Sequence, residues 1–431
     1  MIKTEDINPI FSFQDDFKIS DVAVDQIIDQ YHSPIYIYDA SIIRDQYRKL
    51  RKAMPEKIDI FYAMKPNPTR AIVELLVDQG AGVEVASIGD LVTCQQIGVD
   101  PRNIAYAGPA KTDKELQLSI EMGIHAIHAE SLNEIKRINE FAKQANKTQS
   151  VALRINTNFE IHDTHMSMSG KAKKFGIDES VMVNVIKQAL KLKYIELNGI
   201  HVYSATGILS EDEFLLNMRK SFETAEIANK YFKVTSVDFG GGFGIDYSLQ
   251  RKFNMDYLAP KVNELLESFS FINENNTRII TEPGRYLVAE SGIYITKVID
   301  RKISHGQNML NCDGGIHHFL RTALLGSQHP IVNLSRKSET GDKFEIGGNL
   351  CTPIDSLGSA VSLPEDTAPG DYIGVFLAGA YGYTVAMSLF LNNALPAEVL
   401  VDNGKALLIR ESITPQELLE LQPSIRKDKN V

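Results

Sequence analysis

A lysine at the end of an apolar run is the first feature of the sequence that could do chemistry. Lys65 closely follows the run from Ile58 to Ala63, which only Asp59 interrupts, and Pro66 comes directly after it. This pattern predicts a buried strand that delivers one amine to its carboxyl end. A buried ammonium is costly, so such an amine either pairs with an acid or acts as a neutral nucleophile. On these residues alone a surface lysine at a strand end is the commoner alternative, and the groups that accompany Lys65 must decide.

Further polar groups follow the other predicted strands at the same relative place. In chain order they are Glu84 to Ser87, Arg154, His201 to Ser204, Gly240-Gly241-Gly242 and Glu282-Pro283-Gly284-Arg285. With the lysine they offer a nucleophilic amine, a ring that can stack, glycine N–H groups that can cradle a phosphate, an acid and a base. Together they indicate a phosphorylated, nitrogen-containing aromatic cofactor held as a Schiff base, which describes pyridoxal phosphate. A nucleotide site is the alternative for the glycines, but the G-x-G-x-x-G spacing and an early Rossmann unit are missing.

A regular alternation of strands and helices is expected to position these groups. The predicted strands cover residues 59–63, 82–85, 103–106, 124–128, 151–155, 197–201, 236–239 and 278–281, with helical periodicity between them. Eight βα units are the signature of a (β/α)8 TIM-like barrel, whose active site is built at the carboxyl ends of the strands. After Gly292, β-rich runs separated by Gly, Pro and Asn turns predict an antiparallel β domain. We therefore expect an α/β barrel over residues 41–290, a β domain over residues 291–431, and an N-terminal segment, residues 1–40, that packs with the β domain.

Composition limits the classes of protein to which the chain can belong. Its 431 residues are 43% hydrophobic, which is enough for a large core, and a net charge of −10 argues against nucleic acid as a partner. The acidic first twenty residues contain no apolar core, which argues against a secretory signal, and no apolar run reaches the length of a membrane span. Three scattered cysteines suit a reducing compartment, so we expect a cytoplasmic enzyme without membrane association.

Six short motifs occur in the order found in one known family. They are Tyr62-Ala63-Met64-Lys65, Gly199-Ile200-His201-Val202, Gly240-Gly241-Gly242-Phe243-Gly244, Glu282-Pro283-Gly284-Arg285, Cys351 with Asp355, and Gly379-Ala380-Tyr381-Gly382. In this order they resemble, over nearly the whole chain, the fold-type III pyridoxal-phosphate decarboxylases, which include diaminopimelate, ornithine and biosynthetic arginine decarboxylases. The resemblance implies an alanine racemase-like barrel, pyridoxal 5′-phosphate as the cofactor, and a head-to-tail homodimer with shared active sites.

The resemblance also implies roles for individual residues. Lys65 would hold the cofactor as a Schiff base, His201 would stack on its ring, and Glu282 would pair with the ring nitrogen. Cys351 would donate the proton that replaces CO2, from the neighbouring subunit; a buried apolar thiol is the alternative for an isolated cysteine. The further cofactor-binding residues implied are Glu84, Arg154, Ser204, Gly240, Gly241, Gly242, Gly284, Arg285 and Tyr381. The substrate-binding residues implied are Arg285, Arg321, Thr352, Asp355 and Tyr381.

Several positions depart from the family pattern, and they concern the substrate. Thr352 follows the cysteine where diaminopimelate and ornithine decarboxylases have an acid that binds the distal ammonium of the substrate. Arg321, which resembles the arginine that grips a distal carboxylate, is kept, but Leu325 stands in place of a tyrosine. Tyr203 replaces a glycine, and Pro66 replaces a small residue after the lysine. Because a hydroxyl cannot neutralise a buried ammonium, we expect a substrate without a second free ammonium.

Two branches of the family fit such a substrate. One acts on a glutamyl group tethered to an acyl carrier protein, as in butirosin biosynthesis, and the other decarboxylates citryl-linked amino acids during siderophore assembly. Diaminopimelate decarboxylase is the main alternative. A racemase is disfavoured, since the related alanine racemases have an arginine where this chain has Glu282. A non-catalytic homologue is disfavoured because Lys65 and Cys351 are both present.

Two pairs of nearby histidines lie outside these motifs. His162 and His165 lie in a polar stretch, residues 157–176, that could form a flap, but no third ligand is nearby, and we expect no metal site. For His317 and His318 the sequence leaves open whether they contact the substrate or fill an interface.

Overall fold

A computed structural model describes residues 1–13, 16–159, 166–167, 173–326 and 328–425. His162, His165 and most of the expected flap lie outside these residues. The chain divides into two compact units. The barrel unit comprises residues 43–246 and 250–287, and the β unit comprises residues 1–42, 247–249 and 288–431.

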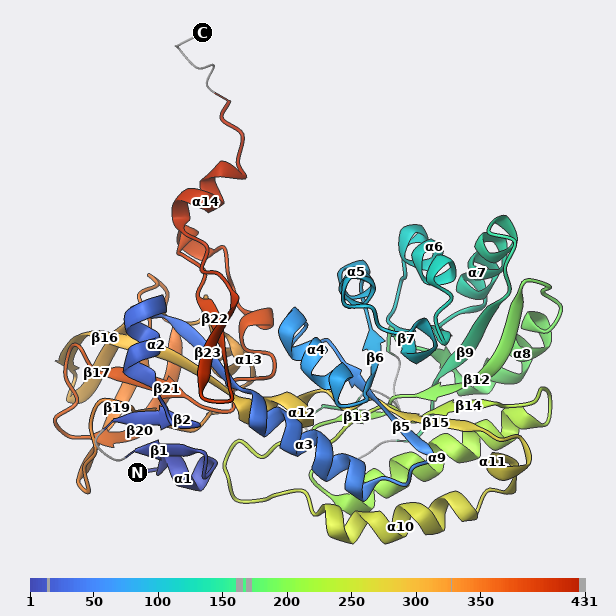
Figure 1. Cartoon of the computed structure of the whole chain (residues 1–431), viewed down its shortest axis with the longest axis horizontal. Helices are drawn as coiled ribbons and strands as arrows, with labels where there is room; N and C mark the ends of the chain where they lie inside the picture. The colour runs from blue at the N-terminus through green and yellow to red at the C-terminus, as the bar shows by residue number, and fades with distance from the viewer. Residues whose placement is uncertain (14–15, 160–165, 168–172, 327, 426–431) are drawn as a thin grey trace. The chain divides into compact units, whose positions relative to one another are not determined.

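The barrel unit is built on eight parallel strands (Figure 1). They are β5 (Ile58–Ala63), β6 (Gly82–Val85), β7 (Ile104–Ala107), β8 (Ala126–Ala129), β9 (Gln149–Asn156), β12 (Ile195–Val202), β14 (Ser236–Asp238) and β15 (Arg278–Thr281). The strands pair in the order β9-β12-β14-β15-β5-β6-β7-β8, and β8 also pairs with β9, which closes the barrel. This confirms the expected (β/α)8 fold. The short strands β10 (Met166–Ser167), β11 (Ile177–Asp178) and β13 (Ala205–Thr206) lie outside the ring of eight.

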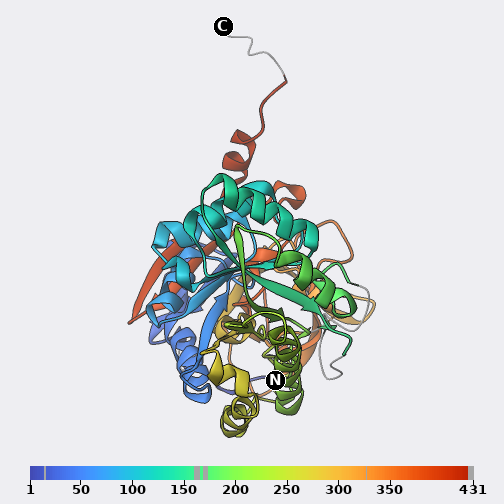
Figure 2. The same cartoon turned by 90° about the vertical axis from the view of Figure 1, so that its right-hand side faces the viewer.

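Helices alternate with the barrel strands along the chain and surround them (Figure 2). They are α3 (Ala40–Ala53), α4 (Arg70–Asp78), α5 (Ile88–Ile97), α6 (Asp113–Met122), α7 (Leu132–Gln144), α8 (Met182–Ala189), α9 (Glu211–Asn229), α10 (Met255–Glu267), α11 (Ser270–Glu274) and α12 (Arg285–Val288). Side chains cap the N-termini of α5, α6 and α7: Ser87, Thr112 and Ser131 each accept a hydrogen bond from the backbone N–H three residues later. No helix among the described residues is long and apolar enough to cross a membrane.

The β unit combines strands from both ends of the chain (Figure 1). Its strands are β1 (Phe11–Phe13), β2 (Phe17–Ile19), β3 (Val22–Ala23), β4 (Ile35–Asp39), β16 (Gly292–Ser304), β17 (Gln307–Cys312), β18 (Ile331–Asn333), β19 (Gly341–Gly347), β20 (Ser356–Pro364), β21 (Tyr372–Val375), β22 (Ala397–Asp402) and β23 (Lys405–Arg410). Its helices are α1 (Thr4–Ile7), α2 (Val24–Tyr31), α13 (Arg321–Leu325) and α14 (Pro415–Glu420). Most pairs are antiparallel as expected, but β17 with β19 and β4 with β22 are parallel. Because β4 precedes the barrel in the chain, its pairing with β22 could not follow from hairpin turns.

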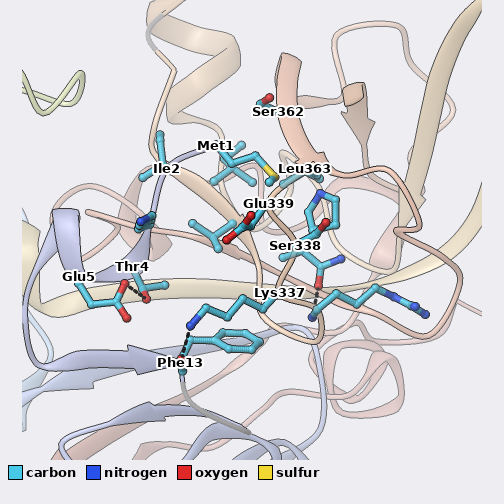
Figure 3. A pocket seen from close by; sticks show the side chains of 16 residues that line it. Met1, Ile2, Thr4, Glu5, Phe13, Lys337, Ser338, Glu339, Ser362 and Leu363 are labelled. Atoms are coloured by element: carbon cyan, nitrogen blue, oxygen red, sulfur yellow. Dashed lines mark hydrogen bonds between the residues drawn. The ribbon is translucent and has the colours of Figure 1, made fainter. Parts of the chain in front are cut away.

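A pocket of about 890 Å³ in the β unit lies between the N-terminal residues and the strands β18 and β20 (Figure 3). Lys337 crosses it and donates a 3.1 Å hydrogen bond to the backbone oxygen of Phe13. Its lining contains none of the residues that the sequence assigns to the cofactor or substrate. The candidate active site therefore has to be sought at the predicted residues themselves.

Candidate active site

Lys65, which follows the end of β5, forms an ion pair with Glu84, which lies on the adjacent strand β6. Its Nζ lies 2.7 Å from Glu84 Oε2. The sequence pattern predicts a buried lysine, but the Lys65 side chain is 37% exposed and that of Glu84 only 1%. Burial accordingly raises the pKa of Glu84 to about 7, although the nearby Lys65 ammonium opposes this shift. The pair keeps the amine at the carboxyl end of β5, where barrel enzymes place reactive groups.

Four buried side chains converge on one point inside the barrel. They are His128 from β8, His201 from β12, Asp238 from β14 and Glu282, which follows β15. Their ligand-type atoms all lie within 4.8 Å of one another. His201 Nε2 is 3.3 Å from Glu282 Oε2, and the two imidazole rings stack with centroids 4.3 Å apart. The family resemblance implied His201 and Glu282 as residues at the cofactor ring, but the sequence did not single out the other two.

The charges in this cluster are set by burial and by the neighbouring groups. Burial lowers the pKa of both His128 and His201, which favours neutral rings. Burial also raises the pKa of Asp238 well above its usual value, and the adjacent Glu282 adds to the effect. Burial alone would raise the pKa of Glu282, but a hydrogen bond from the His201 ring and the positive charge of Lys65 hold it below its usual value. Glu282 is therefore the ionised carboxylate of the cluster and Asp238 the protonated one.

The glycine segment 240–242 packs directly against Glu282. The backbone N–H of Glu282 donates to the carbonyl oxygen of Gly240, at 2.9 Å, and the N–H of Gly240 donates to Asp238 Oδ1, at 2.8 Å. A β-carbon on Gly241 would overlap the Glu282 backbone oxygen. In the part of the chain that the structure describes, the N–H groups of Gly241 and Gly242 have no hydrogen-bond partner. These two consecutive donors are suited to an anion such as a phosphate.

Arg154 and Tyr203 border the same region. Arg154 is buried on β9 and its Nη1 lies 2.8 Å from Glu130 Oε1. The Tyr203 ring, which replaces the family glycine, has its centroid 5.6 Å from Lys65 Nζ and 6.0 Å from the Arg154 guanidinium. It also lies against Gly240, where a β-carbon would come within 2.6 Å of it. Tyr203 therefore contributes an aromatic face next to the reactive amine.

The remaining predicted barrel residues lie in connecting segments. Ser204 is buried just after β12, and Arg285 begins α12. A β-carbon on Gly284 would meet the Pro66 ring at 2.7 Å and the backbone oxygen of Ala63 at 3.0 Å. The proline that departs from the family pattern therefore packs on a glycine of the Glu282 segment.

The β unit carries a second set of predicted residues around Cys351. Cys351 is exposed, whereas burial raises the pKa of Cys94 and Cys312 to about 12. Asp355 is buried and accepts two backbone N–H bonds of 2.8 Å, at Oδ1 from Ile316 and at Oδ2 from Leu350. The structure thus shows Asp355 fixing the segment that carries Cys351. Its contact with a substrate stays a prediction.

Arg321 lies in a cluster of rings in the same unit. Its Nε donates to His329 Nε2, at 3.1 Å, and its guanidinium lies 4.3 Å from the centroid of the Tyr247 ring. His329 Nδ1 in turn is 2.8 Å from the backbone oxygen of Phe376. These contacts hold a nearly fully buried cation in one orientation. Tyr381, the other predicted residue here, is half-buried and has a left-handed φ of 58°.

The barrel residues fit pyridoxal phosphate. The fit rests on a lysine amine at a strand end, an ionised buried carboxylate beside a neutral imidazole, and two adjacent glycine N–H donors that have no partner among the described residues. These suit, in turn, the aldehyde, the ring nitrogen and the phosphate of the cofactor. His128 and Asp238 complete the cluster although the sequence analysis missed them. Their positions at the ends of the fourth and seventh predicted strands were the signal that could have identified them.

Comparisons with known proteins agree with this chemistry. Residues 40–289 match the family model described as the pyridoxal binding domain of pyridoxal-dependent decarboxylases. The chain is 33% identical over 404 residues to the L-glutamyl-[BtrI acyl-carrier protein] decarboxylase of Niallia circulans, covering 91% of this chain and 94% of the relative. It is 31% identical to the diaminopimelate decarboxylase of Methanothermobacter thermautotrophicus, covering 92% and 93%.

A third relative and a solved structure extend the comparison. The 2-[(L-alanin-3-ylcarbamoyl)methyl]-2-hydroxybutanedioate decarboxylase of Staphylococcus aureus is 29% identical, covering 90% of this chain and 99% of the relative. The crystal structure of diaminopimelate decarboxylase from M. jannaschii is similar with a TM-score of 0.90 and 27% identity, covering 97% of this chain and 98% of that one. The cluster at the carboxyl ends of the barrel strands and the match along most of the chain lead to one assignment: the chain belongs to the pyridoxal-dependent decarboxylases.

Proposed function

We propose that the chain removes the α-carboxylate of an L-amino acid, or of an amino-acid conjugate, that has no second free ammonium group. A glutamyl group tethered to a carrier protein and a citryl-linked siderophore precursor are the two substrate types proposed. The single observation that carries this proposal is Thr352, which stands directly after the exposed Cys351. The turn that holds it is closed by a 3.2 Å hydrogen bond from the Asp355 N–H to its backbone oxygen. A threonine there offers a distal ammonium no charge to pair with, and a buried unpaired charge is costly.

Arg321 supports the same substrate class from the other end. Its buried guanidinium, fixed by His329 and Tyr247, can bind a carboxylate or carbonyl at the far end of the substrate. Such an acceptor is present in both proposed conjugates. The relative at 33% identity acts, by its name, on a glutamyl-carrier conjugate, which agrees with this proposal.

We propose the following roles for the barrel residues, and their geometry supports them. When bound, pyridoxal phosphate supplies an electron-withdrawing ring that stabilises the negative charge left when CO2 departs. Lys65 binds the cofactor through its amine, and His201 packs against its ring. Glu282, the ionised carboxylate, holds a proton on the ring nitrogen. The implied contacts of Glu84, Arg154 and Gly284 with the cofactor stay part of this proposal.

The phosphate and the product proton involve other groups. Ser204, the N–H groups of Gly241 and Gly242, Arg285 and Tyr381 bind the phosphate. Substrate binding by Arg285 and by Tyr381 is part of the same proposal. Cys351 delivers the proton that replaces CO2 on the substrate carbon.

We also propose that the protein is a homodimer in which Cys351 completes the active site of the partner. Exposed apolar side chains accompany Cys351 in the β unit: Ile354, Leu324 and Leu389 are 55%, 59% and 69% exposed. The segments that carry Leu324 and Ile354 are tied to each other, since the Thr322 hydroxyl donates to the Ser356 backbone oxygen at 3.0 Å. Apolar surface of this kind is typical of a subunit interface.

Diaminopimelate is the competing substrate, favoured by the 31% identity to a diaminopimelate decarboxylase and by the presence of Arg321. The test is CO2 release and product mass from the cofactor-loaded protein with a glutamyl-carrier conjugate, a citryl-diaminopropionate conjugate, diaminopimelate, lysine, ornithine and arginine. We expect turnover confined to a conjugate. Diaminopimelate turned over faster than the conjugates would refute the proposed substrate class.

Subunit complementation tests the homodimer. The Lys65→Ala and Cys351→Ala variants are each expected to have little activity. If each site takes Lys65 from one chain and Cys351 from the other, co-refolding equal amounts should restore about a quarter of the wild-type rate, because half of the dimers then contain one intact site. No recovery would mean that each site is built within one chain.

A further inference from the structure

His128 occupies a place in the barrel cluster that the proposed reaction leaves without a role. Its side chain is 1% exposed, and each of its ring nitrogens faces a different carboxyl group. Nε2 lies 3.9 Å from Asp238 Oδ2, and Nδ1 lies 3.8 Å from Glu282 Oε1. Its ring also stacks on His201 at 4.3 Å with an angle of 25° between the planes. Three of the cluster's contacts therefore pass through this one ring.

Each of the two carboxyl groups belongs to a different half of the cofactor site. Asp238 holds the glycine segment through the 2.8 Å bond from the Gly240 N–H to its other oxygen. Glu282 is the carboxylate proposed for the ring nitrogen. Apart from His128, the two halves are linked through the backbone, where Gly240 accepts from the Glu282 N–H, and through the neighbouring carboxyl groups of Asp238 and Glu282.

The protonation states of Asp238 and Glu282 allow His128 to accept a hydrogen bond from one and to donate a hydrogen bond to the other. Two buried carboxyl groups this close cannot both ionise cheaply, and the acid of the pair is Asp238. A neutral imidazole can accept a hydrogen bond at one ring nitrogen and donate a hydrogen bond from the other. Asp238 can therefore direct its O–H toward Nε2 or toward the neighbouring Glu282, while Nδ1–H points toward ionised Glu282. The distances are longer than hydrogen bonds, so this is an electrostatic alignment that a small side-chain rotation would tighten.

The backbone of His128 is itself held in place. Lys111 is buried, and its Nζ donates to the His128 carbonyl oxygen, at 2.7 Å, and to Glu134 Oε1, at 3.0 Å. Because Lys111 holds the backbone at the end of β8, the position of the His128 ring along the barrel axis is fixed. A ring held in this way can orient its neighbours.

We propose that His128 is a positioning residue that links Glu282 to Asp238 and so couples the ring-binding and phosphate-binding halves of the cofactor site. The inference rests on the proposed roles of Glu282 and of the glycine segment. It does not depend on the identity of the substrate, since its test measures cofactor binding alone.

Two variants separate the contacts, because each retains one of the two nitrogens. An asparagine amide superposes on the Nδ1 side of histidine, so His128→Asn keeps the Glu282 contact and loses the Asp238 contact. A glutamine amide reaches the Nε2 position, so His128→Gln does the reverse. His128→Leu loses both. The full-length protein is titrated by equilibrium dialysis with pyridoxal phosphate and, separately, with pyridoxal, which lacks the phosphate.

The proposal predicts a crossed pattern of affinities. His128→Asn should bind pyridoxal phosphate about tenfold more weakly but pyridoxal nearly as wild type does, because only the phosphate half is disturbed. His128→Gln should weaken both ligands by a similar factor, and His128→Leu should show both losses. His125→Asn is the matched control: His125 hydrogen-bonds Ser236 at the opposite ends of the strands, so this variant should bind both ligands as wild type does.

Two results would overturn the inference. The first is wild-type affinity of His128→Leu for both ligands. The second is one equivalent of a transition metal in the purified protein that is lost in His128→Leu, because the four clustered side chains would then be a metal centre. If the leucine variant does not fold, the asparagine and glutamine variants give the test by themselves, and equal affinity profiles for the two would refute the division of contacts.

Discussion

Replacing Gly241 by alanine tests whether the glycine segment and Glu282 form one unit. A β-carbon there would overlap the Glu282 backbone oxygen and lie 2.8 Å from its carbonyl carbon and 3.3 Å from the Pro283 α-carbon. Real β-carbons essentially never come closer than 3.0 Å to another atom, and all three neighbours are backbone, which cannot rotate away. The methyl group therefore requires a shift of roughly 1 Å between the two segments. Overpacking of this kind costs about 1–3 kcal/mol of stability.

The shift should damage function more than stability. It moves the proposed phosphate donors relative to the proposed ring-nitrogen carboxylate, and a misplacement of about 1 Å can cost on the order of 100-fold in rate. The assay combines cofactor affinity, thermal unfolding and CO2 release. Gly108→Ala is the matched control, because a β-carbon there meets nothing closer than 3.6 Å. Wild-type cofactor affinity and rate in Gly241→Ala would refute the close packing of the two segments and the role drawn from it.

Three further predictions concern charge and the proton donor. Burial raises the folded-state pKa of Glu84 from 4.5 to about 7, so its protonation contributes stability that is fully present below pH 4.5 and is lost as the pH rises through 7. Denaturant unfolding from pH 5 to pH 8 should therefore show up to about 3 kcal/mol less pH dependence in Glu84→Gln than in wild type, and equal slopes would contradict this. Cys351→Ala should bind the cofactor normally but slow or misdirect protonation, seen as loss of stereospecific deuterium in product made in D2O; full rate and fidelity would exclude Cys351 as the acid. Thr352→Glu should gain diaminopimelate turnover while the uncharged Thr352→Gln does not, and equal behaviour of the two would show that charge at this position does not select the substrate.

The barrel could be predicted from the sequence because its strands are short apolar runs bounded by turn residues. The expected runs 82–85 and 278–281 coincide with β6 and β15, and the other six differ by one or two residues at one or both ends. Because parallel strands of a closed barrel end at one face, the polar residues that follow the strands could be expected at that face, where Lys65 lies near Glu84 and His201 near Glu282.

Other features depend on contacts that no local pattern encodes. His128 and Asp238 end strands as the predicted residues do, but only the closed ring brings them within 4 Å of each other. Asp355 fits a family motif, yet its two oxygens bind backbone N–H groups, a partnership that is invisible in a sequence. In the Lys65–Glu84 pair the buried side chain is that of Glu84, because the strand ends leave Lys65 partly exposed and cover Glu84.

The most direct test of the central assignment is to locate the lysine that binds the cofactor. Holoprotein is reduced with borohydride, digested, and searched by mass spectrometry for the peptide that carries the pyridoxyl phosphate group. Lys65 is predicted, because its amine is accessible and next to Glu84, whereas the buried Lys111 is engaged by Glu134 and two carbonyl oxygens. The label on Lys65, absent from Lys65→Ala, would support the account; a label on Lys111 or on any other lysine would contradict it.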